Sequence, residues 1–231
     1  MAHFVGDLEG DGVFAAALAH RATSPSAGKT RREILFFVLD ARHSQWAHNL
    51  LLNLAELGRA GQALAIASSR EACAKLLTRV AADTLTCGTS SFLRKAGSGA
   101  NSTLTAALNR WRIRDWHVYH LWWQRWHYLA WAVKLGYNAL SLDTDISLRS
   151  DPYAVFHSVL RHRHLLVGLD SEAGGHERPG LFPMINVGLV YCQDCDPDGP
   201  AHRVLSDVTR RVKNFLLGPV LYKTRHGRTD L

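Results

Sequence analysis

The sequence predicts an α/β fold, in which a mostly parallel sheet is flanked by helices in a single domain. Short apolar segments of strand length alternate with longer segments of helical spacing, an order that is typical of βαβ units. The apolar segments at 34–39 and 139–142 are nearly continuous, as expected for parallel strands that are buried on both faces. The chain has 231 residues, which is enough for one domain with a substantial core.

The N-terminal segment 1–32 differs from the rest of the chain. It is rich in Gly, Ala, Ser and Pro and shows no apolar periodicity, so we expect a poorly structured tail there. The folded domain is then expected to span 33–231.

Strand and helix signals alternate in the first half of this domain. The first strand is aromatic-rich and ends at Asp40. Leucines spaced by four and three residues predict the helix that follows, Gly58 ends it, and Ser69 is the expected N-cap of the next helix. The expected elements of this half are 34–39, 44–57, 63–67, 69–80 and 84–87.

The second half opens with a helix that carries five of the seven tryptophans and is ended by Gly136. We expect most of these indoles to pack in the core, although aromatic rings can also stack on sugars. Pro152 is expected at the first position of a short helix, and a later strand leads to Asp170. The expected elements of this half are 115–135, 139–142, 152–160, 164–168, 185–191 and 201–216.

Composition excludes several classes of protein. The formal net charge of +7 is spread along the chain, so a nucleic-acid partner is not expected. No segment reaches the roughly 18 to 20 apolar residues of a membrane span. Cys192 and Cys195 have C-x-x-C spacing, but Cys73 and Cys87 form no second such pair for a zinc site, so we expect free or incidentally paired thiols.

Asp143 and Asp145 form a D-x-D motif directly after the strand at 139–142. Two further D-x-D matches, at 194–196 and 196–198, lie in a Pro- and Gly-rich loop and are expected to be solvated turns. A parallel strand delivers its last residues to the carboxyl edge of the sheet, where open α/β sheets bind ligands. Two carboxylates there can hold a hard divalent cation, which can in turn hold a diphosphate.

A longer pattern surrounds this motif. It consists of the run Arg125-Trp-His-Tyr-Leu-Ala-Trp-Ala-Val-Lys-Leu-Gly-Tyr-Asn-Ala-Leu-Ser-Leu-Asp-Thr-Asp-Ile-Ser-Leu-Arg-Ser-Asp151-Pro152 and the later strand Ile185-Asn-Val-Gly-Leu189. The pattern resembles the nucleotide-diphospho-sugar transferase family, GT-A-type glycosyltransferases of plants and algae that include xylosyl- and arabinosyltransferases. The resemblance implies a GT-A-like fold, a UDP-sugar or similar donor, a glycan or glycoprotein acceptor, Mn²⁺ or Mg²⁺, and a location in the Golgi.

The resemblance also assigns expected roles to residues. Asp143 and Asp145 match the metal-binding and catalytic donor positions, and Arg125 matches a basic helix residue near the diphosphate. The remaining donor-binding candidates are Asn186 and Gly188 of the second motif, Asp170 at the end of the intervening strand, and Asp40, where such folds begin to bind the base. For Arg125, Asn186 and Asp170 a purely structural role stays open.

Two alternatives to a glycosyltransferase remain at this stage. A sugar nucleotidyltransferase would favour a Gly-rich phosphate loop after the first strand, whereas this chain has Asp40-Ala-Arg-His-Ser44. A non-catalytic or degenerate binding protein is the second alternative. Family members continue past the final helix with an acidic segment and a metal-binding His, so we expect the domain to be incomplete at its C-terminus, with its activity in doubt.

Overall fold

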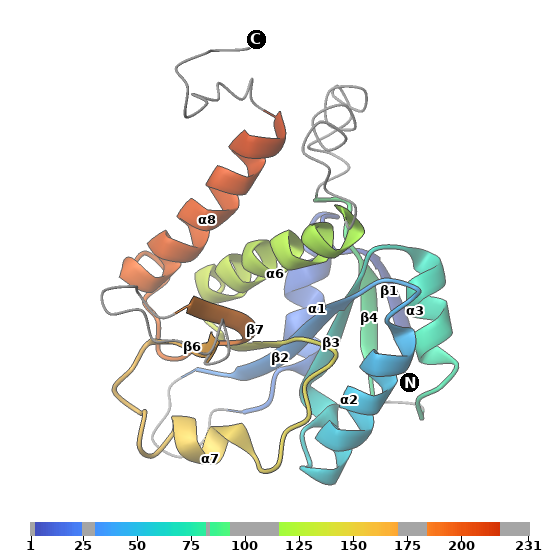
Figure 1. Ribbon diagram of the computed structural model, residues 1–231, viewed down its shortest axis with the longest axis horizontal. Coiled ribbons are helices and arrows are strands. Elements are labelled where there is room, and N and C mark those ends of the chain that lie inside the picture. The colour runs from blue at the N-terminus through green and yellow to red at the C-terminus, as the bar shows by residue number, and fades with distance from the viewer. Residues whose placement is uncertain (1–2, 25–30, 82–83, 93–115, 171–183, 218–231) are drawn as a thin grey trace.

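One seven-stranded sheet organises the computed structural model, which describes residues 3–24, 31–81, 84–92, 116–170 and 184–217 (Figure 1). The strands are β1 His3–Asp7, β2 Glu33–Leu39, β3 Ala63–Ala67, β4 Thr86–Thr89, β5 Asn138–Leu142, β6 Leu165–Asp170 and β7 Met184–Cys192. Their order is β1-β4-β3-β2-β5-β7-β6. Neighbours from β1 to β5 are parallel, and β7 pairs antiparallel with both β5 and β6. The predicted α/β class with a mostly parallel sheet is confirmed.

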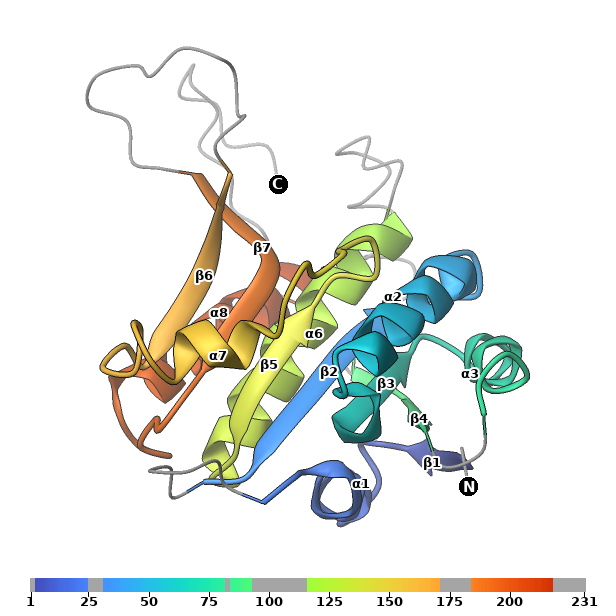
Figure 2. The ribbon, with the colours of Figure 1, turned by 90° about the horizontal axis from the view of Figure 1, so that it is seen from below.

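Helices cover both faces of this sheet, as Figure 2 shows in the view from below. They are α1 Val13–Arg21, α2 Ser44–Glu56, α3 Arg70–Leu77, α6 Trp116–Lys134, α7 Pro152–Phe156 and α8 Pro200–Leu217, with a 3₁₀ turn at Ala60–Gln62. Strand β2 is buried along its whole length, and its side chains belong to two separate hydrophobic cores. Ile34 and Phe36 pack with α1, α6 and α8, whereas Leu35 and Phe37 pack with α2, α3 and α7.

The helix boundaries follow the local signals in the sequence. Ser69 caps α3, because its hydroxyl accepts the N–H of Ala72 at 3.2 Å. Asp151 caps α7 in the same way, with Pro152 at the first helical position. Gly136 follows α6 with a φ of +84°, a left-handed conformation that favours glycine. No described helix is long and apolar enough to cross a membrane.

The prediction of a poorly structured tail over 1–32 is wrong for residues 3–24. Strand β1 pairs with β4 at the edge of the sheet, and α1 buries Phe14, Ala17 and Leu18 against the core. These three residues have i, i+3, i+4 spacing, a helical pattern that the surrounding alanines concealed. The sheet packs closely here, since a Cβ on Gly88 of β4 would lie 2.5 Å from Leu8.

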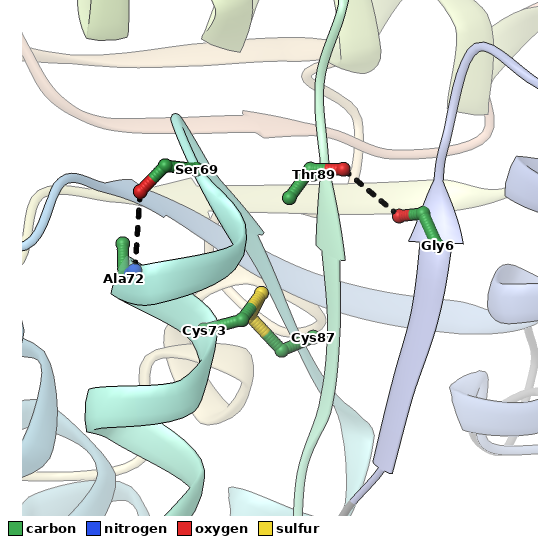
Figure 3. Close-up of a disulfide and its surroundings, with 6 residues drawn as sticks. All are labelled: Gly6, Ser69, Ala72, Cys73, Cys87 and Thr89. Atoms are coloured by element: carbon green, nitrogen blue, oxygen red, sulfur yellow. Dashed lines mark hydrogen bonds between the residues drawn. A yellow bond between two sulfur atoms is a disulfide. The ribbon is translucent and has the colours of Figure 1, made fainter.

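A disulfide between Cys73 and Cys87 joins α3 to β4 (Figure 3). Both residues are buried, and their Cα atoms are 5.8 Å apart. Cys192 and Cys195 are buried free thiols at the end of β7 and in the turn after it. The four cysteines therefore form one disulfide, and the two cysteines of the C-x-x-C pair remain free. The sequence alone had not decided which thiols would be free and which paired.

Candidate functional site

Strand β5 carries Asp143 to the carboxyl edge of the sheet. The Asp143 N–H donates to the carbonyl of Gly188 on β7 at 2.7 Å, which holds the backbone just beyond the strand. The Asp143 side chain is 28% exposed, and Asp145 lies further out on the following turn. The two carboxylates thus differ: one is half-buried against the sheet, and the other faces solvent.

Arg125 on α6 forms an ion pair with Asp143 from the interior of the protein. Its guanidinium is fully buried and donates both to Asp143 Oδ1 and to the carbonyl of Val187. Burial lowers the pKa of Arg125, although the charge of Asp143 opposes this shift. Burial also raises the pKa of Asp143, and although Arg125 opposes the shift, Asp145 adds to it. Direct contact between Arg125 and a phosphate stays a prediction, since it would require this ion pair to open.

Asn186 and Gly188 of the second motif lie beside the same carboxylate. The Gly188 N–H donates to Asn186 Oδ1 at 2.7 Å, so this exposed asparagine bonds to its own strand. A Cβ on Gly188 would lie 2.8 Å from Asn186 Oδ1 and 3.2 Å from Asp143 Oδ2. Glycine is therefore required for β7 to pass this close to the Asp143 carboxylate.

Asp40 follows β2 and organises the start of α2. Its Oδ1 accepts the N–H groups of Arg42 and His43 at 2.8 and 3.0 Å and contacts the His43 ring at 2.6 Å. Burial opposes its charge, but the hydrogen bonds from the His43 amide and ring and from the Arg42 amide outweigh burial and lower its pKa. Asp40 thereby orients His43 toward the site, while a contact with a nucleotide base stays a prediction.

Asp170 is the last residue of β6 and pairs with Met184 on β7. It lies two positions beyond Gly168, whose partner across the hairpin is Asn186. Its backbone is thus on the same hairpin as the second motif, although its side chain is outside the described part of the structure.

Two adjoining hollows open beside Asp145, and Trp46, Thr144 and Asp145 line both. The smaller, about 150 Å³, is also lined by His43, Trp122 and Asp143, and the larger, about 400 Å³, by Asn49 and Asn53. The indoles of Trp46 and Trp122 are 50% and 40% exposed. The sequence interpretation missed Trp46 as a site residue, although its place in the first turn after Asp40 was a usable signal.

Asn53 on α2 holds the loop that follows the D-x-D motif. Its side-chain amide donates to the Leu148 carbonyl at 3.0 Å and accepts the Leu148 N–H at 2.7 Å. A second tether joins Arg59 to Asp151 at the end of the same loop. The turn bearing Asp145 is thus fixed to α2 at its far end.

Asn53→Ala is expected to lower the free energy of unfolding by about 1–2 kcal/mol, because it removes both hydrogen bonds to Leu148. Urea denaturation measures the change. Asn49→Ala is the matched control, since Asn49 lies one turn earlier on α2 and lines the same hollow without holding this loop. An equal loss in the two variants would contradict the tethering role.

The donor atoms near Asp143 suit a hard divalent cation. The described residues contain no group of three or more His, Cys, Asp or Glu side chains that could hold a metal ion by themselves. Mg²⁺ and similar ions, however, are often held by only one or two carboxylates together with substrate phosphates and waters. Asp143 and Asp145 fit that mode of binding.

Comparisons with known proteins give little beyond this geometry. No family model matches the chain, and no curated protein matches it in sequence. Among solved structures, it is similar to LgtC, a galactosyltransferase crystallised in complex with donor and acceptor sugar analogues. The two share 11% sequence identity with a TM-score of 0.42, and the match covers 70% of this chain and 57% of that one. Similarity at this level assigns neither a family nor an activity.

Proposed function

We propose that this protein is a glycosyltransferase that moves a sugar from a nucleotide-diphosphate donor, a UDP-sugar, to a glycan or glycoprotein acceptor. One observation carries the proposal: Asp143 is held in place by the buried Arg125 and by β7, and it lines a hollow that Asp145 also lines. A carboxylate in a cleft whose pKa is perturbed by burial and by specific charged neighbours is a candidate functional residue, and Asp143 meets this description. The family resemblance of the sequence supports the same assignment, including a Golgi location.

Each residue has a distinct part in this proposal. Asp145 and Oδ2 of Asp143, the oxygen for which no bond to Arg125 is seen, would hold Mn²⁺ or Mg²⁺, which would supply a Lewis acid for the charge on the leaving diphosphate. Arg125 positions Asp143, and Gly188 leaves room for its carboxylate. Trp46 and Trp122 offer half-exposed indole faces on which a base or sugar ring can pack.

The turn after β2 argues against a sugar nucleotidyltransferase. A phosphate-binding loop presents free backbone N–H groups to its ligand. Here the N–H groups of Arg42 and His43 are both bonded to the Asp40 carboxylate. The remaining alternative, a binding protein without catalysis, shares the donor site and is separated from an enzyme only by turnover.

Calorimetric titration with UDP in the presence and absence of Mn²⁺ tests the donor site. We expect Mn²⁺-dependent binding that Asp145→Asn weakens by at least about ten-fold, since a charge-bearing ligand to the ion is lost. Asp196→Asn is the matched control, because Asp196 is an exposed member of another D-x-D and should leave binding unchanged. Manganese-independent binding, or an Asp145→Asn variant that binds like the parent, would refute the proposal. Hydrolysis of a panel of UDP-sugars would then distinguish an enzyme from a binding protein.

A further inference from the structure

A separate groove of about 380 Å³ is lined by residues of α6 and α8. The two helices contact each other, and Figure 1 shows the N-terminal part of α8 next to α6. The groove is on another side of α6 from the donor site. Arg125 reaches Asp143, whereas His127, two residues and about 200° further around the helix, lines the groove. A ligand in this groove would therefore not compete with one at Asp145.

The charged side chains that line the groove are all basic. Lys134 and Arg210 line it together with His127 and His202, and the lining contains no carboxylate. The carboxylates that contact these basic side chains lie outside the lining: Asp198 pairs with Lys134, Asp207 with Arg210, and Glu9 lies 2.9 Å from His127. The groove thus presents N–H donors and positive charge, which favour an anionic group.

The uncharged lining adds features that suit a sugar ring. Trp131 contributes an indole that is only partly buried, and aromatic faces of this kind pack on rings with apolar faces. Ser206, Thr209 and Asn214 follow one another along the facing side of α8 and offer hydroxyl and amide groups. The volume is in the range of small-molecule sites, which is about 300–1,000 Å³.

We propose that the groove between α6 and α8 is an accessory site for an acidic saccharide, whose ring packs on Trp131 and whose carboxylate or sulfate meets Lys134 and Arg210. The inference does not depend on the donor site. The groove combines an indole, hydroxyl groups and two cations whose carboxylate partners lie outside the lining, and this combination matches a ligand that is both sugar and anion. A neutral sugar would make no use of the two cations, and a bare anion would make no use of the indole.

Calorimetry with four probes tests the chemistry of the ligand. Digalacturonate and a sulfated disaccharide should bind, whereas maltose and inorganic sulfate should bind at least about ten-fold more weakly. Binding of maltose or of inorganic sulfate as tight as that of the acidic sugars, or no binding of either acidic sugar, would overturn the proposal.

Matched variants locate the binding in the groove. Arg210 and Arg211 are adjacent, exposed and both paired with Asp207, but only Arg210 lines the groove. Arg210→Gln should weaken binding of the acidic sugar about ten-fold, and Arg211→Gln should change it less than about two-fold. Equal effects of the two would overturn the assignment. Ser206→Trp, which fills the groove, should abolish binding, and retained binding in a folded Ser206→Trp variant would also overturn it.

Asp145→Asn keeps the two proposals separable. This variant should bind UDP in the presence of Mn²⁺ at least about ten-fold more weakly than the parent and should bind digalacturonate like the parent. Loss of digalacturonate binding in a folded Asp145→Asn variant would contradict a separate groove site. A parent protein that binds digalacturonate but not UDP would support the groove and refute only the donor site.

Discussion

Asp143→Ala is expected to lower the free energy of unfolding by about 3–5 kcal/mol, because it leaves the buried guanidinium of Arg125 without its counter-charge. Burial lowers the pKa of Arg125, and burial together with the charge of Asp145 raises the pKa of Asp143, so the attraction between the two groups does not fully offset these costs. The intact ion pair therefore contributes little to the free energy of unfolding. Removing Asp143 alone is costly, because the charge of Arg125 then stays buried without a partner. Urea denaturation monitored by tryptophan fluorescence measures the loss.

Two comparisons test this explanation. Asp145→Ala should change the free energy of unfolding by no more than about 0.5 kcal/mol, since Asp145 is exposed. Replacing both partners, Arg125→Met with Asp143→Ala, should recover part of the stability lost in Asp143→Ala. If Asp143→Ala and Asp145→Ala were equally stable, Arg125 would not depend on Asp143.

This difference changes how site variants are interpreted. A loss of UDP binding in an Asp143 variant would combine a lost ligand to the ion with a disturbed core. Loss in an Asp145 variant reports on the site alone. Asp145, the less constrained member of the motif, is therefore the better probe of donor binding.

Much of the fold and part of the site follow from local sequence signals. The run of β2, the caps at Ser69 and Asp151 and the stop at Gly136 all depend on a few adjacent residues, and each was predictable. The same holds for the strand that carries Asp143. Strand β1 was missed because it is short and is stabilised by pairing with β4, and helix α1 was missed because it is alanine-rich and is stabilised by packing on the core.

The arrangement around Asp143 depends on contacts between distant segments. The D-x-D motif and the N-x-G strand could be recognised, but the sequence did not show that Arg125 would be buried behind Asp143. Nor did it show that a Cβ on Gly188 would meet that carboxylate. Trp46 was missed because its exposure depends on the turn set by Asp40, which periodicity alone does not describe.

The second large effect is expected at the disulfide. Cys73→Ala with Cys87→Ala should lower the free energy of unfolding by about 3 kcal/mol, because the cross-link restricts the unfolded chain across a separation of 14 residues. Denaturation with and without a reductant measures this loss. The parent should lose a similar amount when reduced in the unfolded state, whereas the double variant should be insensitive to the reductant.

Cys195→Ala is the control for this prediction, since it removes a buried thiol that forms no disulfide. Its stability should still depend on the reductant, as in the parent. If reduction left the parent unchanged, the cross-link would not contribute to stability.

The disulfide is also expected to have no effect on the donor site. Because Cys73 and Cys87 tie α3 to a strand separated from β5 by β3 and β2, UDP binding by the folded double variant should remain as in the parent. A loss of UDP binding would mean that the position of Asp143 depends on the region around α3 and β4 as well as on its contacts with α6 and β7.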